Sequence, residues 1–195
     1  MKIAIIGWGS LIWCPGSLRL SSLWRGDGPK LPIEFARISS DERLTLVVHS
    51  QGQKVTTYWA FSAFQAMPDA IRNLRERENC GSRCIGTLQR GKLPARGYTQ
   101  QIKIWLDAHG DVDAVIWTAL PSNWQEKRKK KFTIKDALAY LAELEARGQT
   151  AGAALSRTRE YIRNTPSQIQ TRLRRKISRN KEWADNELSD ALFES

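Results

Sequence analysis

The pattern of apolar and polar positions divides the chain into a strand-rich first part and a helical second part. Short runs of β-branched and aromatic residues predict strands, and the segments rich in Gly and Pro between them are typical of loops. The predicted strands are residues 2–7, 33–38, 43–49, 54–62, 98–106 and 114–120. One helix, residues 68–78, stands between the strand groups. Because strands and helices do not alternate strictly, the pattern favours an α+β fold over a doubly wound parallel sheet.

Helical periodicity in the second part begins at Thr133. A Thr followed three positions later by Asp136 resembles a capping box, which marks the start of a helix. Apolar residues then recur at a spacing of three or four, at Ile134, Leu138, Leu141 and Leu144. Gly148 is expected to end this helix, because Gly commonly follows a helix C-terminus.

Two further helices are predicted towards the C-terminus. One covers residues 151–163, and the next is capped by Thr165 with Pro166 at its first position. The apolar stripe of that last helix is Ile169, Leu173 and Ile177. Short isolated helices are marginal in water, so we expect all three to pack on the strand-rich part. The predicted organisation is a strand-rich domain, residues 1–122, and a helical extension, residues 123–195.

Composition narrows the class of protein. The chain has 195 residues, 41% of them hydrophobic, which is enough to bury a core and too apolar for a disordered protein. No stretch reaches the roughly 18 apolar residues that a membrane span needs. The apolar N-terminus is interrupted by Gly7, Gly9 and Ser10, unlike a signal peptide. An odd number of cysteines, three, argues against a secreted disulfide framework, so we expect a cytoplasmic protein without membrane attachment.

Positive charge is concentrated in two segments of the second part. The net charge is +11, from 31 Lys and Arg against 20 Asp and Glu, and such a field attracts polyanions and anionic small molecules. The basic segments are Lys127–Lys131 and Arg172–Lys181. Each is either a solvated surface or a weak binding site for nucleic acid or an acidic partner. On the last helix, Arg172, Arg175 and Lys176 are expected to face solvent.

The segment after the first predicted strand, residues 7–11 (Gly-Trp-Gly-Ser-Leu), is a candidate binding loop. It lacks the third glycine of a dinucleotide-binding loop, where Ile12 stands, and Pro15 and Gly16 prevent a long helix from starting. Small residues bring backbone N–H groups close to a ligand, and consecutive N–H groups can bind an anion. Ser10 adds a hydroxyl group. The alternative is an ordinary glycine turn after a strand.

Glu78 is the second candidate, as an acid/base group. It continues the apolar face that Ile71 and Leu74 begin, because residues three and four apart lie on one side of a helix. A carboxylate on such a face is partly desolvated, which suits general acid/base catalysis. The alternatives are that the helix frays before Glu78, or that Glu78 pairs with Arg75 or Arg83.

Other polar residues offer weaker candidates. Cys80 and Cys84 form a Cys-x₃-Cys pair, but two thiols without a nearby His do not make a zinc site. The pair is either reactive or inert. His49 at a strand end and His109 in a turn are expected to be solvated or structural. We therefore predict no metal site.

The loop and the glutamate together give the chain a resemblance to the γ-glutamylcyclotransferase-like superfamily. Its members begin with a strand that runs into a Tyr-Gly-Ser loop, and here the loop is Trp8-Gly9-Ser10-Leu11. They also carry a glutamate in a Leu-x-x-x-Glu setting on a helix after a strand, which Leu74 and Glu78 match here. The resemblance covers roughly residues 3–120. The chain departs from the family in having Trp for the usual Tyr of the loop, and Ile85 where a Tyr often follows the glutamate.

The resemblance implies a small mixed β-barrel with a few helices beside it. It also implies an intramolecular aminolysis, in which the free α-amino group of a γ-glutamyl unit attacks its own side-chain amide carbonyl. An amine leaves and 5-oxoproline forms. Glu78 would then be the catalytic carboxylate, and residues Trp8, Gly9, Ser10 and Leu11 would bind the substrate. Neither a metal nor another cofactor is required.

Two functions of different classes follow from these observations. The first is a cofactor-independent γ-glutamyl cyclotransferase acting on a small γ-glutamyl substrate. The second is a non-enzymatic binding module on the same fold, which would use its basic segments to bind nucleic acid or an acidic partner. A Glu78 carboxylate that is held in an ion pair and lies outside any cleft would remove the main support for the first.

Overall fold

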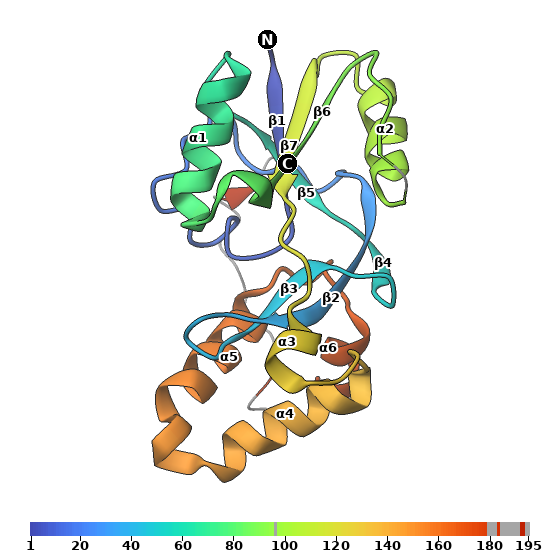
Figure 1. Ribbon diagram of the computed structural model, residues 1–195. Coiled ribbons are helices and arrows are strands. Elements are labelled where there is room, and N and C mark those ends of the chain that lie inside the picture. Colours follow the sequence, from blue (N-terminus) through green and yellow to red (C-terminus); the bar gives the residue numbers. More distant parts are fainter. Residues whose placement is uncertain (96, 179–182, 184–191, 194–195) are drawn as a thin grey trace. The chain divides into compact units, whose positions relative to one another are not determined.

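Two separate β-sheets organise the chain, and each belongs to a different compact unit (Figure 1). The computed structural model describes residues 1–95, 97–178, 183, 192 and 193. The first unit contains Met1–Leu31 and Thr56–Leu120, together with the described residues Leu192 and Phe193. The second contains Pro32–Val55 and the described residues between 121 and 183. Sheet and helix occur together in both units, which confirms the predicted α+β class.

Strand β1 (Ile3–Gly7) lies inside the four-stranded sheet of the first unit, whose order is β5–β1–β7–β6. It pairs antiparallel with β5 (Tyr58–Phe61) and parallel with β7 (Ala114–Thr118). The edge strand β6 (Ile85–Gln89) pairs antiparallel with β7. All five residues of β1 are buried, because a central strand covered on both faces needs a continuous apolar run. The predicted first strand is confirmed.

Helix α1 (Met67–Glu78) packs against β6 and β7 of the same unit. Pro68 lies in its first turn, where a missing N–H leaves no helical hydrogen bond unmade. Ala70 and Leu74 are fully buried. Asn79 ends the helix in the left-handed conformation, with φ of 46°, and its N–H donates to the Glu76 carbonyl. The predicted helix is confirmed, and Glu78 is its last residue.

The strand predicted at residues 98–106 is wrong, because α2 (Thr99–Ala108) is a helix. Its buried residues Ile102, Trp105 and Leu106 are three and four positions apart, so the same apolar residues form one helix face. Trp105 packs edge-on against Trp59 of β5, with the ring centroids 5.1 Å apart. Large aromatic side chains favour strands in a short window, but here they serve a helix that packs on another indole.

The second unit has a three-stranded sheet in the order β3–β2–β4. Its strands are β2 (Lys30–Ile38), β3 (Leu44–Val48) and β4 (Gln53–Thr56). The strands predicted at 33–38 and 43–49 are confirmed as the antiparallel pair β2 and β3. The single strand predicted at 54–62 is instead two strands, because Thr57 separates β4 from β5 and the two belong to different sheets.

Helices of the second unit cover this sheet. They are α3 (Trp124–Arg128), α4 (Ile134–Ala146), α5 (Gly152–Asn164) and α6 (Arg172–Ile177). The Thr133 hydroxyl accepts the Asp136 N–H at 3.1 Å, which confirms the predicted cap of α4. Helix α5 packs on β3, where the Leu44 N–H donates to the Thr158 hydroxyl at 3.2 Å. The apolar stripes of α4 and α5 are therefore matched by the sheet and by each other.

The predicted start of the last helix is wrong. The structure begins α6 at Arg172 and caps it with the Thr171 hydroxyl, which accepts the Arg174 N–H at 3.1 Å. The Thr165 hydroxyl instead donates to the Tyr161 carbonyl at 2.8 Å, at the end of α5. A Thr followed by Pro166 fits a helix start by composition, but here Thr165 closes the preceding helix.

The observed division of the chain differs from the predicted domains 1–122 and 123–195. The boundary near residue 121 agrees, but Pro32–Val55 groups with the helices that follow residue 121. The physical reason is the packing of α5 on β3, which joins strands from early in the chain to helices from late in it.

A carboxylate lies in the interior of the second unit. Glu34 of β2 is fully buried, and its Oε1 accepts the Phe35 N–H at 3.0 Å while Oε2 accepts the Arg172 N–H at 3.0 Å. Arg172 is the first residue of α6, so the carboxylate satisfies an N–H group that has no acceptor within the helix. Burial is the largest influence on the group and raises the pKa of Glu34, which these hydrogen bonds only partly offset.

This burial predicts a pH-dependent contribution of Glu34 to stability. The folded-state pKa of Glu34 lies above the unfolded value of about 4.3. At a pH between these two values, the folded protein therefore binds more protons than the unfolded chain does. Stability contributed by Glu34 is then present at low pH and lost as the pH rises through the folded pKa. We expect the free energy of unfolding of the wild type, relative to E34Q, to increase as the pH falls from neutrality. Urea denaturation of both proteins over a pH series measures this, and a pH-independent difference would contradict it.

Candidate active site

The loop after β1 is a compact turn seated on Trp24. The Ile12 N–H donates to the Gly9 carbonyl at 3.0 Å, and the Cys14 N–H donates to the Ser10 carbonyl at 2.9 Å. Gly7 is required at its start, because a Cβ there would lie 2.9 Å from the Trp24 indole. The loop therefore leaves the sheet at a position fixed by both β1 and that ring.

Consecutive backbone N–H groups of this loop are available to a ligand. Among the described residues, the amides of Gly9, Ser10 and Leu11 have no hydrogen-bond partner. The side chains of Trp8 and Leu11 are buried and hold the turn in place, while Ser10 is half-buried. Three such amides in succession are the arrangement that binds an anion, such as a carboxylate. This favours a binding loop over a glycine turn of purely structural use.

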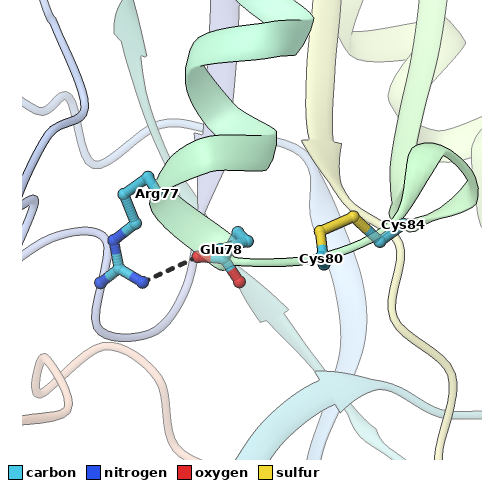
Figure 2. Close-up of a disulfide and its surroundings, with 4 residues drawn as sticks. All are labelled: Arg77, Glu78, Cys80 and Cys84. Carbon is cyan, nitrogen blue, oxygen red and sulfur yellow. Dashed lines mark hydrogen bonds and ion pairs between the residues drawn. A yellow bond between two sulfur atoms is a disulfide. The ribbon is translucent and has the colours of Figure 1, made fainter.

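The Glu78 carboxylate lies at the end of α1 and is mostly buried, with 14% of its side-chain surface exposed. Its Oε1 accepts an N–H of the Arg77 guanidinium at 2.9 Å (Figure 2). The expected alternatives were fraying of the helix before Glu78 or a pair with Arg75 or Arg83, whereas the helix reaches Glu78 and the observed pair is with Arg77. This ion pair meets one of the two conditions that together would remove the main support for an enzyme. The low exposure shows a carboxylate largely withdrawn from bulk water.

Arg77 joins the loop to the helix end. Its guanidinium donates to the Ser10 hydroxyl at 3.1 Å and to the Cys14 carbonyl at 2.7 Å, in addition to Glu78. The side chain is 15% exposed, and its charge-assisted hydrogen bonds to Ser10 and Glu78 are partly buried, whereas the bond to Cys14 is exposed. The structure thus brings two sequence-predicted residues, Ser10 and Glu78, to opposite sides of one guanidinium.

Sequence reasoning missed Arg77. Adjacent residues on a helix point about 100° apart, so the apolar spacing that singled out Glu78 places Arg77 on a different side. Its long side chain nevertheless reaches the carboxylate and the loop. A basic residue beside the candidate glutamate was the available signal, but the same helix also carries Arg72 and Arg75.

Cys80 and Cys84 are joined in a disulfide directly after Glu78 (Figure 2). Their Cα atoms are 6.1 Å apart, which a disulfide can span. From the sequence this pair was open between reactive and inert thiols, and the odd number of cysteines argued against a secreted disulfide framework. Cys14 is a free, exposed cysteine.

The two histidines lie away from this cluster and are structural. His109 follows α2, stacks on the Trp105 ring with centroids 4.1 Å apart, and lies 3.5 Å from an Asp27 carboxylate oxygen. The His49 ring packs edge-on against Phe132, and burial lowers the pKa of His49. In the described part of the chain, no group of three or more His, Cys, Asp or Glu is placed to hold a metal ion.

Most of the described basic residues in the two segments are exposed, but Arg128, which pairs with Glu143, and Arg174 are not. Lys127, Lys129 and Lys131 face solvent, as do Arg172, Arg175 and Lys176. Arg174, by contrast, is 1% exposed and donates to the Pro166 carbonyl at 2.6 Å and the Ile169 carbonyl at 3.1 Å. It therefore stabilises the turn before α6 and does not contribute to a basic surface. The rest of that predicted segment, Arg179 to Lys181, lies outside the described residues.

Neither similarity to known proteins nor a membrane-spanning helix points to a function. No protein-family model, no curated protein and no solved structure matches the chain. Within the described residues, every helix is too short or too polar to cross a bilayer.

Proposed function

We propose that the chain is a cytoplasmic, cofactor-independent enzyme of the γ-glutamylcyclotransferase type, which converts a γ-glutamyl substrate into 5-oxoproline and a free amine. The fold that goes with this proposal is the small mixed β-barrel of that superfamily, with a helical extension. The observation that carries the proposal is the bridge through Arg77, which connects the Ser10 hydroxyl to the Glu78 carboxylate. Loop and glutamate are the two features in which the sequence resembles the family.

Substrate binding would begin at the loop. The α-carboxylate of the γ-glutamyl group would accept hydrogen bonds from the unpartnered amides of Gly9, Ser10 and Leu11. The α-ammonium group of the same substrate carbon would then face Glu78, and would share that carboxylate with Arg77. The N–H donors of the loop would thus match the substrate's carboxylate, and the Glu78 carboxylate would match its ammonium group.

The chemical step needs one proton acceptor and one proton donor. Glu78 takes a proton from the α-ammonium group, and the free amine that remains forms a bond to the γ-carbonyl carbon. The bond from that carbon to the leaving nitrogen breaks as Glu78 returns the proton to this nitrogen. The ring nitrogen loses its second proton to Glu78, which passes it to the released amine, so 5-oxoproline and an ammonium ion are formed. The five-membered ring brings nucleophile and carbonyl together within one molecule, so the protein supplies little of the proximity itself.

Arg77 ties the glutamate to the loop. Its guanidinium donates to the Glu78 carboxylate at 2.9 Å. The same guanidinium donates to the Ser10 hydroxyl and the Cys14 carbonyl, which belong to the loop segment. Arg77 is therefore a positioning residue in this proposal, and Glu78 is the residue that exchanges the proton.

Replacement of Glu78 by Gln tests the proposal. Gln keeps the size and a hydrogen-bond acceptor for Arg77 but cannot take up the proton, so we expect a loss of about 10² to 10⁴ in kcat with the fold retained. The measurement is release of 5-oxoproline from a panel of γ-glutamyl amines, with circular dichroism to verify folding. Glu76→Gln is the matched control, because Glu76 is exposed on the same helix turn and should leave turnover unchanged. Wild-type turnover by E78Q would remove the assigned role.

A binding module is the second candidate, favoured by the exposed basic residues of the second unit. Lys127 lies in the last turn of α3, Lys129 ends that helix and Lys131 follows it, and three further exposed cations lie on α6. The left-handed conformation of Lys129, with φ of 57°, terminates α3 within this basic segment. Exposed cations without a fixed acidic partner can bind a polyanion through counterion release.

Salt dependence decides whether this surface binds nucleic acid. If six cations contact phosphates, affinity for a generic single-stranded RNA should fall by about 300-fold between roughly 50 and 200 mM salt. Fluorescence anisotropy with a labelled single strand at both salt concentrations measures it. Lys127→Gln combined with Lys129→Gln and Lys131→Gln should reduce the slope, whereas no binding at low salt leaves these residues as a solvated surface.

A further inference from the structure

The Cys80–Cys84 disulfide begins two residues after the Glu78 carboxylate (Figure 2). Glu78 is the last residue of α1, Asn79 is its cap, and Cys80 is the next residue. The Cys80 N–H donates to the Arg75 carbonyl at 3.3 Å, and the Asn79 N–H donates to the Glu76 carbonyl at 3.2 Å. The final turn that carries the carboxylate is thus closed by the same residues that lead into the disulfide.

The other end of the disulfide is attached to the sheet. Cys84 precedes β6, and its carbonyl accepts the Ala119 N–H at 2.6 Å, just after β7. Strand β7 pairs with β1, from which the Trp8–Leu11 loop emerges. The covalent bond therefore connects the carboxylate-bearing end of α1 to the sheet that carries the candidate binding loop.

The disulfide closes a loop of few residues, with a sequence separation of only 4. Stabilisation of a whole domain by a disulfide grows with the length of the loop that it closes, so a short loop contributes little to global stability. Its main effect is local: it restricts the backbone conformations of the segment between Glu78 and Ile85. Such a bond can be opened without unfolding the unit.

Solvent can reach one end of the pair. Cys80 is half-buried, Cys84 is only 6% exposed, and the intervening Gly81 borders open space. A small thiolate can therefore attack the Cys80 sulfur, with the Cys84 thiolate as leaving group.

We propose that Cys80 and Cys84 are a reversible thiol-modification site, whose disulfide holds the Glu78 end of α1 in place. In the reducing direction, one small-molecule thiol forms a mixed disulfide with Cys80 and releases the Cys84 thiolate. A second thiol displaces Cys80 and leaves as the oxidised small-molecule disulfide, so two thiols are oxidised for each disulfide reduced. The structural statement stands on the contacts above, and its consequence for turnover rests on the proposed function.

The test follows the full-length protein in buffers of reduced and oxidised dithiothreitol. Alkylation and intact mass give the thiol count, and the exposed Cys14 serves as an internal reference that is labelled in both states. We expect one label in the oxidised protein and three in the reduced protein. Hydrogen exchange is then followed for the segment from Arg75 to Ile85, with helix α2 as the reference segment.

Reduction should accelerate amide exchange in that segment by about tenfold or more, with α2 unchanged, and should lower kcat by about tenfold, because misplacement of a catalytic group is costly. The Cys80→Ser/Cys84→Ser variant should match the reduced protein in every buffer. Unchanged exchange on reduction, or a disulfide that resists reduced dithiothreitol in the folded protein, would overturn the inference. An equal kcat in the oxidised and reduced protein would also overturn the inference, while leaving the proposed function intact. A change in amide exchange with no turnover in either redox state would support the role of the disulfide in holding the end of α1, and would reject the proposed function.

Discussion

Burial of β1 on both faces is the constraint on which the first unit depends. A strand that pairs on both edges and is covered on both faces must be apolar throughout, and Ile3–Gly7 is. The chain can only leave such a strand through a tight turn, and Gly7 provides it where the Trp24 indole leaves no room for a side chain. Packing of α1 against β6 and β7 of the same sheet then gives the helix its position. The candidate loop and the Glu78 helix end are thus both anchored on one sheet.

A guanidinium converts this proximity into a defined arrangement. Arg77 donates to a hydroxyl, a backbone carbonyl and a carboxylate, which belong to the loop and to the helix. Such charge-assisted bonds are strong and directional, and removal of one partner leaves the others unsatisfied. The same bonds leave the loop amides free, so the cluster combines a held carboxylate with anion-binding donors. That combination suits a substrate with a carboxylate and an ammonium group on one carbon.

Features set by local pattern were predictable from the sequence, and those set by long-range packing were not. The continuous apolar run of β1, the proline start of α1 and the Thr133 cap each have a local signature, and the structure has all three. Helix α2 was mistaken for a strand because its aromatic residues fit both periods, and only packing on Trp59 distinguishes them. In the site, Ser10 and Glu78 were found by motif and spacing. Arg77 was missed because its long side chain reaches the loop from a different side of the helix. The Cys80–Cys84 bond was missed because cysteine pairing depends on the course of the backbone between α1 and β6.

The central claim is that the Gly9, Ser10 and Leu11 amides and the Glu78 carboxylate form one site for a γ-glutamyl-derived ligand. The most direct measurement is a titration of ¹⁵N-labelled protein with 5-oxoproline, the product of the proposed reaction, followed by amide chemical shifts. The account predicts saturable shifts at Gly9, Ser10 and Leu11 and at the α1 end around Glu78, with the amides of α2 unchanged. Saturable shifts confined to the second unit, or a loop that does not respond at any concentration of the ligand, would contradict it.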